Sequence, residues 1–197
     1  MRTVITTHGL VLAALFAALT ALGALVSIPI YGQVPFTLQV LFVLMAGLVL
    51  GPRLAGLSMI AYLAVGLVAP VYAGGASGLG ALLGPTGGYL WGFVVGALLV
   101  GGLRATTRSA RPVVLAAIAA AGLVPIYAVG AVWLAWQMDW SVVKALQLGV
   151  VPFVAWDAAK AVVAGLVAVA LARSPLVLPA FGGATPNPSP TPPSGEG

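Results

Sequence analysis

Six apolar segments occupy most of this chain of 197 residues, and they restrict the folds that it can adopt. The segments are separated by charged residues, proline and glycine, and they lie at about 10–28, 36–51, 54–70, 86–103, 112–135 and 151–172. Only 6% of the residues are charged, whereas roughly a quarter are charged in a soluble domain, whose surface faces water. The sequence therefore predicts an all-α integral membrane protein with six transmembrane helices in the lipid bilayer. The second and third segments are short for a bilayer core about 30 Å thick, which needs about 20 helical residues.

The basic residues indicate how these spans are oriented. Six arginines lie in linkers on one side of the predicted topology: Arg2, Arg53, Arg104, Arg108, Arg111 and Arg173. The loop between the fifth and sixth spans, on the other side, contains Lys144 and Asp139. Cytoplasmic loops carry an excess of Lys and Arg, so we expect both termini in the cytoplasm.

The chain divides into three parts by composition. Residues 1–9 form a short cytoplasmic N-terminus, 10–173 the six-helix transmembrane domain and 174–197 a cytoplasmic tail. From about residue 182 the tail is rich in proline, serine and glycine, so we expect it to be disordered. A cleaved signal peptide is an alternative interpretation of the first segment, because Arg2 precedes an apolar stretch.

Several classes of function lack the residues that they need. The chain contains no cysteine and a single histidine, His8, which leaves no cluster for a metal site or for nucleophilic catalysis. No G-x-x-x-x-G-K-[ST] loop is present for ATP hydrolysis. The basic residues form no patch with interleaved aromatics, which argues against nucleic acid as a partner. We therefore expect a protein that is not an enzyme and needs no cofactor.

The last apolar segment, VPFVAWDAAKAVVAGLVAVAL, contains an acid and a base, Asp157 and Lys160. A charge at the centre of a bilayer costs roughly 2.5–3.5 kcal/mol on insertion scales, so two of them in one span need an explanation. Residues three apart lie on one face of a helix, and these two can point together into the bundle. Three interpretations stay open: an anchor for a small ligand with hydrogen-bond donors and acceptors, an ion pair that only locks two helices, and a proton relay.

Two further stretches interrupt the helical pattern. In SIPIYGQVPFTLQ (27–39), the residues Pro29, Gly32 and Pro35 forbid a continuous helix, and we expect a capping loop or an ordinary turn at the extracellular rim. In residues 71–93 the density of glycine allows the backbone to fold back or to approach a ligand closely. A ridge for close helix packing is predicted from the glycines that recur every four residues: Gly84, Gly88, Gly92 and Gly96.

Alanines form a similar stripe along the first span. Two adjacent faces carry alanine at four-residue spacing, Ala13, Ala17 and Ala21 on one and Ala14 and Ala18 on the next. Such a stripe lets another helix approach closely, either within this protein or in a partner. This order also favours a span over a signal peptide.

Tryptophans gather around the loop between the fifth and sixth spans: Trp133, Trp136, Trp140 and Trp156. The membrane interface is the usual place for tryptophan, and we expect most of them there. Trp156 differs because it adjoins Asp157, where its ring could flank a ring-shaped ligand.

Three separated motifs together resemble the BioY family, the biotin-binding S components of energy-coupling-factor (ECF) transporters. They are ALFAALTALGALVSIPIYGQVPFTLQVLFVLMAGLVLGPRLAG, AGGASGLGALLGPTGGYLWGF and VPFVAWDAAKAV, and the similarity runs from about residue 13 to 172. The resemblance implies an S-component fold in the bacterial cell membrane that binds biotin from outside. It also implies two kinds of partner, a transmembrane T component and a pair of ABC-type ATPases, which fits the missing nucleotide loop.

The resemblance also implies roles for particular residues. Asp157 and Lys160 match the acid and base that contact biotin in the family, and either alanine face of the first span matches the docking site for the T component. Gln39, Tyr89 and Trp156 are additional candidates for the pocket because of their polarity and predicted location. A solitary carrier of biotin or another small solute, working without ATPase partners, is the alternative.

Overall fold

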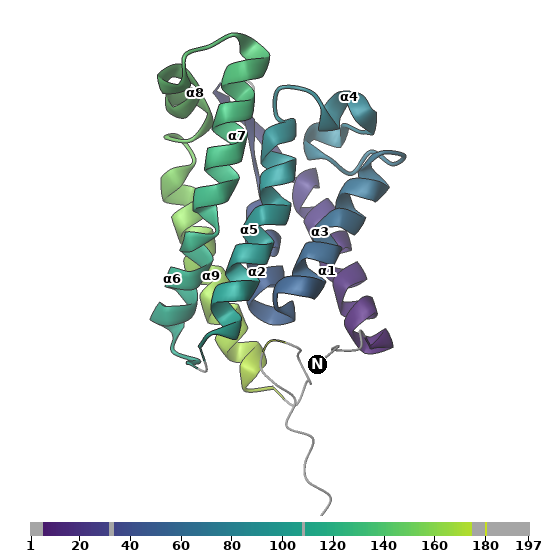
Figure 1. Ribbon diagram of the computed structural model, residues 1–197, viewed down its shortest axis with the longest axis vertical. Helices are drawn as coiled ribbons and strands as arrows, with labels where there is room; N and C mark the ends of the chain where they lie inside the picture. Colours follow the sequence, from purple (N-terminus) through teal and green to yellow (C-terminus); the bar gives the residue numbers. More distant parts are fainter. Residues whose placement is uncertain (1–5, 32–33, 108, 175–179, 181–197) are drawn as a thin grey trace, which may run out of the picture.

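The structure is a computed structural model that describes residues 6–31, 34–107, 109–174 and 180. Its helices stand side by side in a bundle (Figure 1). In chain order the elements are α1 (Thr7–Leu25), β1 (Ser27–Tyr31), β2 (Val34–Thr37), α2 (Gln39–Leu50), α3 (Pro52–Gly66), η1 (Ala73–Gly75), α4 (Gly78–Leu82), α5 (Gly87–Ala105), α6 (Pro112–Ala121), α7 (Leu123–Met138), α8 (Val142–Gly149) and α9 (Val154–Ala172). This arrangement confirms the predicted all-α membrane protein.

Every predicted span corresponds to helix in the structure. The 19-residue helices α1, α5 and α9 and the 27-residue stretch Pro112–Met138 are long and apolar enough to cross a membrane. The second and third spans, α2 and α3, are short as predicted, with 12 and 15 residues. The fifth span is divided into α6 and α7 at Gly122, three residues before Pro125, whose ring nitrogen cannot donate the helical hydrogen bond.

A β-hairpin accounts for the short α2. β1 pairs with β2 antiparallel, with Ser27 opposite Thr37 and Ile28 opposite Phe36. Helix α2 therefore begins only at Gln39 and, at about 1.5 Å per residue, is too short to span a bilayer alone. The predicted capping loop thus contains the paired strands β1 and β2, and Gln39, expected at the rim, is buried.

A second irregular segment follows α3. It contains η1, α4 and three glycines with left-handed backbone, Gly74, Gly75 and Gly78, at φ of 68°, 76° and 81°. Other residues rarely adopt this conformation, so the glycine density predicted for residues 71–93 serves a tight reversal of the chain. In Figure 1, α4 lies at the same end of the bundle as α8, opposite the end marked N.

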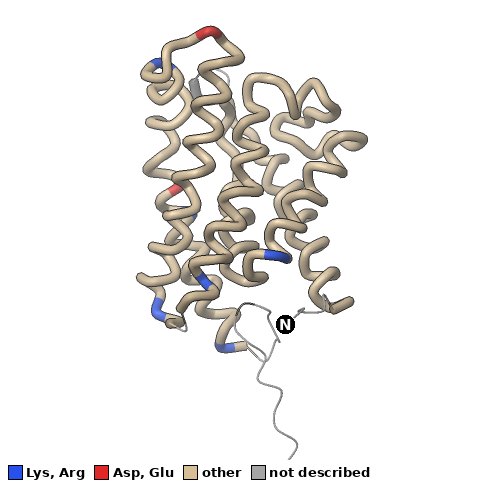
Figure 2. The backbone as a smooth tube through the Cα atoms, viewed as in Figure 1, with Lys and Arg blue, Asp and Glu red and all other residues tan. Residues whose placement is uncertain are grey.

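Charged residues are distributed unequally between the two ends of the bundle. Most of the Lys and Arg positions lie at the end marked N (Figure 2). Arg53 lies in the first turn of α3, Arg104 in the last turn of α5, and Arg111 and Arg173 directly flank α6 and α9. We call this the basic end, and the end that holds α4 and α8 the loop end. The remaining two arginines, Arg2 and Arg108, and the tail from about residue 182 lie outside the described residues.

The predicted glycine ridge packs α5 against α7. A Cβ atom added to Gly92 would lie 2.9 Å from the Cα of Ile126, and one added to Gly88 would lie 2.2 Å from the Cβ of Trp133. A Cβ atom added to Gly96 would lie 2.8 Å from the Cγ1 of Ile126. Gly84 precedes the helix, and its carbonyl oxygen accepts a hydrogen bond of 2.9 Å from the Trp133 indole. The ridge therefore fixes both the distance and the rotation between α5 and α7.

Adding a methyl group to this ridge should force α5 and α7 apart. We expect Gly92→Ala to lower the free energy of unfolding by about 1–3 kcal/mol, because its neighbour is the Ile126 backbone, which cannot move aside cheaply. The matched control is Gly102→Ala in the same helix, where nothing lies within 4 Å of the added atom. Thermal unfolding in detergent should show a lower melting temperature for Gly92→Ala only. Equal melting temperatures for the two variants would contradict this role of the ridge.

Candidate ligand-binding site

A cavity lies beneath the hairpin, between residues of β2 and the surrounding helices. The centre of a water molecule can occupy about 90 Å³ of it, several times the volume that one buried water needs. Its walls come from β2, α2, the segment after α3, α5, α7, the end of α8 and α9. Most wall residues are apolar, and the polar ones are Thr37, Gln39, Tyr72, Thr86, Tyr89, Tyr127, Asp157 and Lys160.

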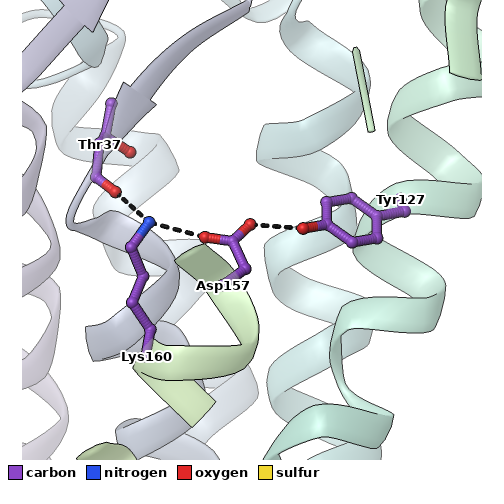
Figure 3. A network of polar contacts seen from close by, with 4 residues as sticks. All are labelled: Thr37, Tyr127, Asp157 and Lys160. Carbon is purple, nitrogen blue, oxygen red and sulfur yellow. Dashed lines mark hydrogen bonds and ion pairs between the residues drawn. The ribbon is translucent and has the colours of Figure 1, made fainter. Parts of the chain in front are cut away.

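The acid and base predicted from the sequence meet in the wall of this cavity. Lys160 Nζ lies 2.6 Å from Asp157 Oδ1, and the two residues are only 7% and 3% exposed. Both side chains leave α9 on the same face, as their spacing of three residues predicts (Figure 3). The pair therefore neutralises itself away from water, as buried charges must.

Two groups from the hairpin complete the surroundings of Lys160. Its ammonium donates a hydrogen bond of 2.6 Å to the carbonyl oxygen of Thr37, at the end of β2. The ring of Phe36 lies beneath the same nitrogen, 4.0 Å from ring centroid to Nζ, which is a cation–π distance. An ammonium has three donors, and here they face a carboxylate, a carbonyl and an aromatic ring.

Tyr127 is a cavity residue that the sequence did not identify. Its phenol donates a hydrogen bond of 2.6 Å to Asp157 Oδ2, the carboxylate oxygen that Lys160 leaves free (Figure 3). The sequence could have indicated this residue, because Tyr127 lies within the apolar fifth span and a buried tyrosine hydroxyl needs a hydrogen-bond partner. That signal does not say which partner the hydroxyl finds.

Tyr89, predicted as a pocket residue, lines the cavity from α5. Its hydroxyl donates to the Gly149 carbonyl at 2.9 Å, at the end of α8. Its ring occupies space that only glycine leaves open, because a Cβ at Gly130 would lie 2.3 Å from the ring. Gly149 is close as well, since a Cβ there would lie 2.3 Å from the Tyr89 hydroxyl. These two glycines therefore determine the position of Tyr89.

Gln39, also predicted for the pocket, lines the cavity from the start of α2. Its amide nitrogen donates to the Tyr62 hydroxyl at 2.5 Å, and that hydroxyl donates to the Val71 carbonyl at 3.1 Å. Tyr72 donates to the Leu63 carbonyl at 2.7 Å. Tyr72 lies in the loop after α3, and burial raises the pKa of its phenol. The chain reversal after α3 is thus tied to the helix that precedes it.

Trp156 is not brought into the cavity wall. It is 59% exposed, and its ring meets the edge of Phe36 with 5.8 Å between centroids. Trp136 is 73% exposed, which fits the predicted position at the membrane interface. The role of Trp156 toward a ligand stays a prediction.

The two alanine faces of α1 differ in their surroundings. Ala13 and Ala17 are buried against the bundle, Ala21 is partly buried, and Ala14 and Ala18 are exposed. The face with Ala14 and Ala18 is therefore open to another protein or to lipid.

The site is suited to binding. Within residues 6–31, 34–107, 109–174 and 180, no group of three His, Cys, Asp or Glu side chains could hold a metal ion. The cavity offers a charged pair, hydroxyl and amide groups and an apolar wall, which together suit a small molecule with polar and apolar parts.

Comparisons with known proteins agree with each other. The family model of the BioY family matches residues 1–175. The probable biotin transporter BioY of Pyrococcus horikoshii is 43% identical over 158 residues, which are 80% of this chain and 91% of that protein. The biotin transporter BioY of Thermotoga maritima is 41% identical over 165 residues, or 83% and 95% of the two chains.

A solved structure agrees as well. The crystal structure of the S-component for biotin from an ECF-type ABC transporter matches with a TM-score of 0.80 at 29% identity, covering 88% of this chain and 95% of that one. The match confirms the predicted S-component fold. Because sequence and fold agree over nearly their whole length, this chain belongs to the BioY family.

Proposed function

We propose that this chain is the biotin-binding subunit, or S component, of an ECF-type ABC transporter and that it captures biotin for uptake. One observation carries the proposal: the Asp157–Lys160 pair is buried in a cavity wall, in a family whose members include biotin transporters. The family is one of transporters rather than enzymes. The sequence has no nucleotide-binding loop, so the energy comes from a T component and ABC-type ATPases.

Biotin has the groups that this cavity wall requires. Its ureido ring carries two N–H donors and one carbonyl acceptor, and its valerate chain ends in a carboxylate. We assign an N–H to Asp157 and the ureido carbonyl or the valerate carboxylate to Lys160. Lys160 already contacts Thr37 and Asp157 at 2.6 Å each, so the ligand oxygen shares or replaces one of them. A ligand without these groups would leave buried polar atoms unpaired, at a cost of about 1–3 kcal/mol each.

The remaining predicted pocket residues take supporting positions. Gln39 and Tyr89 line the cavity from α2 and α5, and we assign them polar contacts to the ligand. Trp156 is assigned a supporting position behind Lys160, because its ring packs against Phe36, whose ring lies against the Lys160 ammonium.

The T component is proposed to dock on the exposed alanine face of α1. Ala14 and Ala18 form this face, whereas Ala13 and Ala17 pack inside the bundle, where no partner helix can reach them. Small side chains let two helices approach closely in a membrane, where lipid gives no hydrophobic driving force for association.

The protein is proposed to lie in the cell membrane with its basic end in the cytoplasm. The arginines at this end support the orientation, because cytoplasmic loops carry the excess of Lys and Arg. Both termini, including the tail after residue 174, then lie inside the cell, and the cavity beneath the hairpin lies in the outer half of the membrane. Biotin would enter it from outside.

Removing either charge should abolish tight biotin binding. We expect Asp157→Asn and Lys160→Met to weaken equilibrium binding to the purified chain by more than about tenfold, because each leaves its buried partner uncompensated. Asp139→Asn and Lys144→Met are the matched controls, since they make the same changes in the loop between α7 and α9, outside the cavity wall. Equal losses in all four variants, or no binding by folded wild-type protein, would refute the assignment.

A bulky residue on the exposed face of α1 should block partner assembly without affecting biotin. We expect Ala14→Trp to lower co-purification with the T component by about tenfold or more while biotin binding is unchanged. Val163→Trp provides the control, because it adds the same side chain at an exposed position of α9. If both variants assemble equally well, the partner docks on another surface.

Cysteine labelling should reveal the orientation without background, because the natural chain contains no cysteine. We expect Val142→Cys, exposed in α8, to react with a membrane-impermeant maleimide added to intact cells. Thr106→Cys, which is exposed at the basic end, should react only after the membrane is permeabilised. The reverse pattern would place the loop end in the cytoplasm and overturn the proposed entry from outside.

A further inference from the structure

Tyr127 is connected to the charged pair but has no part in the contacts assigned to biotin above. Its hydroxyl donates to Asp157 Oδ2 at 2.6 Å, while Lys160 donates to Oδ1 at 2.6 Å (Figure 3). A carboxylate can turn about its last bond until its oxygens meet their donors. Two short hydrogen bonds, one from α7 and one from α9 itself, therefore fix the plane of the Asp157 carboxylate.

The packing of α7 determines where the Tyr127 hydroxyl lies. The preceding residue, Ile126, rests on the glycine ridge of α5, where a Cβ at Gly92 would lie 2.9 Å from its Cα. Successive residues are about 100° apart around a helix. With Ile126 packed against α5, Tyr127 lines the cavity and its hydroxyl reaches Asp157 on α9. The packing of α7 against α5 thus determines on which side of α7 the Tyr127 phenol lies.

The hydrogen bonds also determine which polar groups the cavity offers. An ionised carboxylate and a backbone carbonyl can only accept, so Tyr127 must donate to Asp157 and Tyr89 must donate to Gly149. A hydroxyl has one proton, and both phenols have used theirs. Toward the cavity these two oxygens, like the Asp157 carboxylate, can then only accept hydrogen bonds. This part of the wall suits a ligand group that donates N–H.

We infer that Tyr127 is a positioning residue that orients the Asp157 carboxylate for the N–H donors of the ligand and makes the site selective for ligands that carry them. The inference rests on the proposed biotin-binding function. Tyr127 acts through Asp157, so its effect should depend on the carboxylate being present.

A double-mutant cycle tests this dependence. We expect Tyr127→Phe to weaken biotin binding by about tenfold in the wild-type background and by about threefold or less in the Asp157→Asn background. Tyr89→Phe is the matched control, because it removes the same hydroxyl from the same cavity but from a bond to Gly149. Its effect should be the same factor in both backgrounds.

Ligand selectivity gives a second readout that needs only single variants. Wild-type protein should prefer biotin to its ureido N-methyl derivatives, and Tyr127→Phe should reduce this preference by about threefold or more. An unchanged preference in Tyr127→Phe overturns the inference, as does an equal effect of Tyr127→Phe in both backgrounds of the cycle. Binding that is measurable in Asp157→Asn but undetectable in the double variant means that the losses add, which also overturns it. Folded wild-type protein that binds no biotin overturns the proposed function instead, and this inference with it.

Discussion

A carboxylate and an ammonium buried inside a membrane protein need hydrogen bonds and opposite charges from protein groups, because no water is there to solvate them. In this chain the Lys160 ammonium donates to the Asp157 carboxylate and the Thr37 carbonyl and lies against the Phe36 ring. The Asp157 carboxylate also accepts a hydrogen bond from the Tyr127 hydroxyl. These groups come from α7, α9 and the hairpin, and the hairpin lies far from both helices in the sequence. The charged pair therefore ties together the elements that surround the cavity.

The same requirement explains why part of the membrane-embedded chain is not helical. Within an α-helix the Thr37 carbonyl would accept the N–H four residues later, and it would be less available to a lysine. Because β2 ends at Thr37 and α2 begins at Gln39, the carbonyl can turn to Lys160. The short second span thus creates the space for the cavity and also supplies one of the groups that make its charge tolerable.

Local patterns in the sequence predicted the spans, the glycine ridge and the acid–base pair, because each depends on spacing within one segment. The antiparallel pairing of the hairpin was not predicted, since Pro29 and Pro35 exclude a helix without specifying a partner strand. Tyr127 was missed because its direction depends on how Ile126 packs against another helix. The buried alanine face of α1 also could not be chosen from the sequence, because both faces have the same spacing.

When the donors of a binding site already have protein partners, a ligand binds by exchanging protein–protein hydrogen bonds for protein–ligand ones. Lys160 already donates to the Thr37 carbonyl and the Asp157 carboxylate, so a ligand oxygen that engages it replaces an existing hydrogen bond and gains only the difference. The correct ligand therefore gains little from each polar contact. An incorrect ligand loses more, because it displaces a partner that it cannot replace and leaves a buried group unpaired. In such a cavity the polar wall contributes mainly selectivity, and the affinity has to come from the apolar surface that the ligand buries.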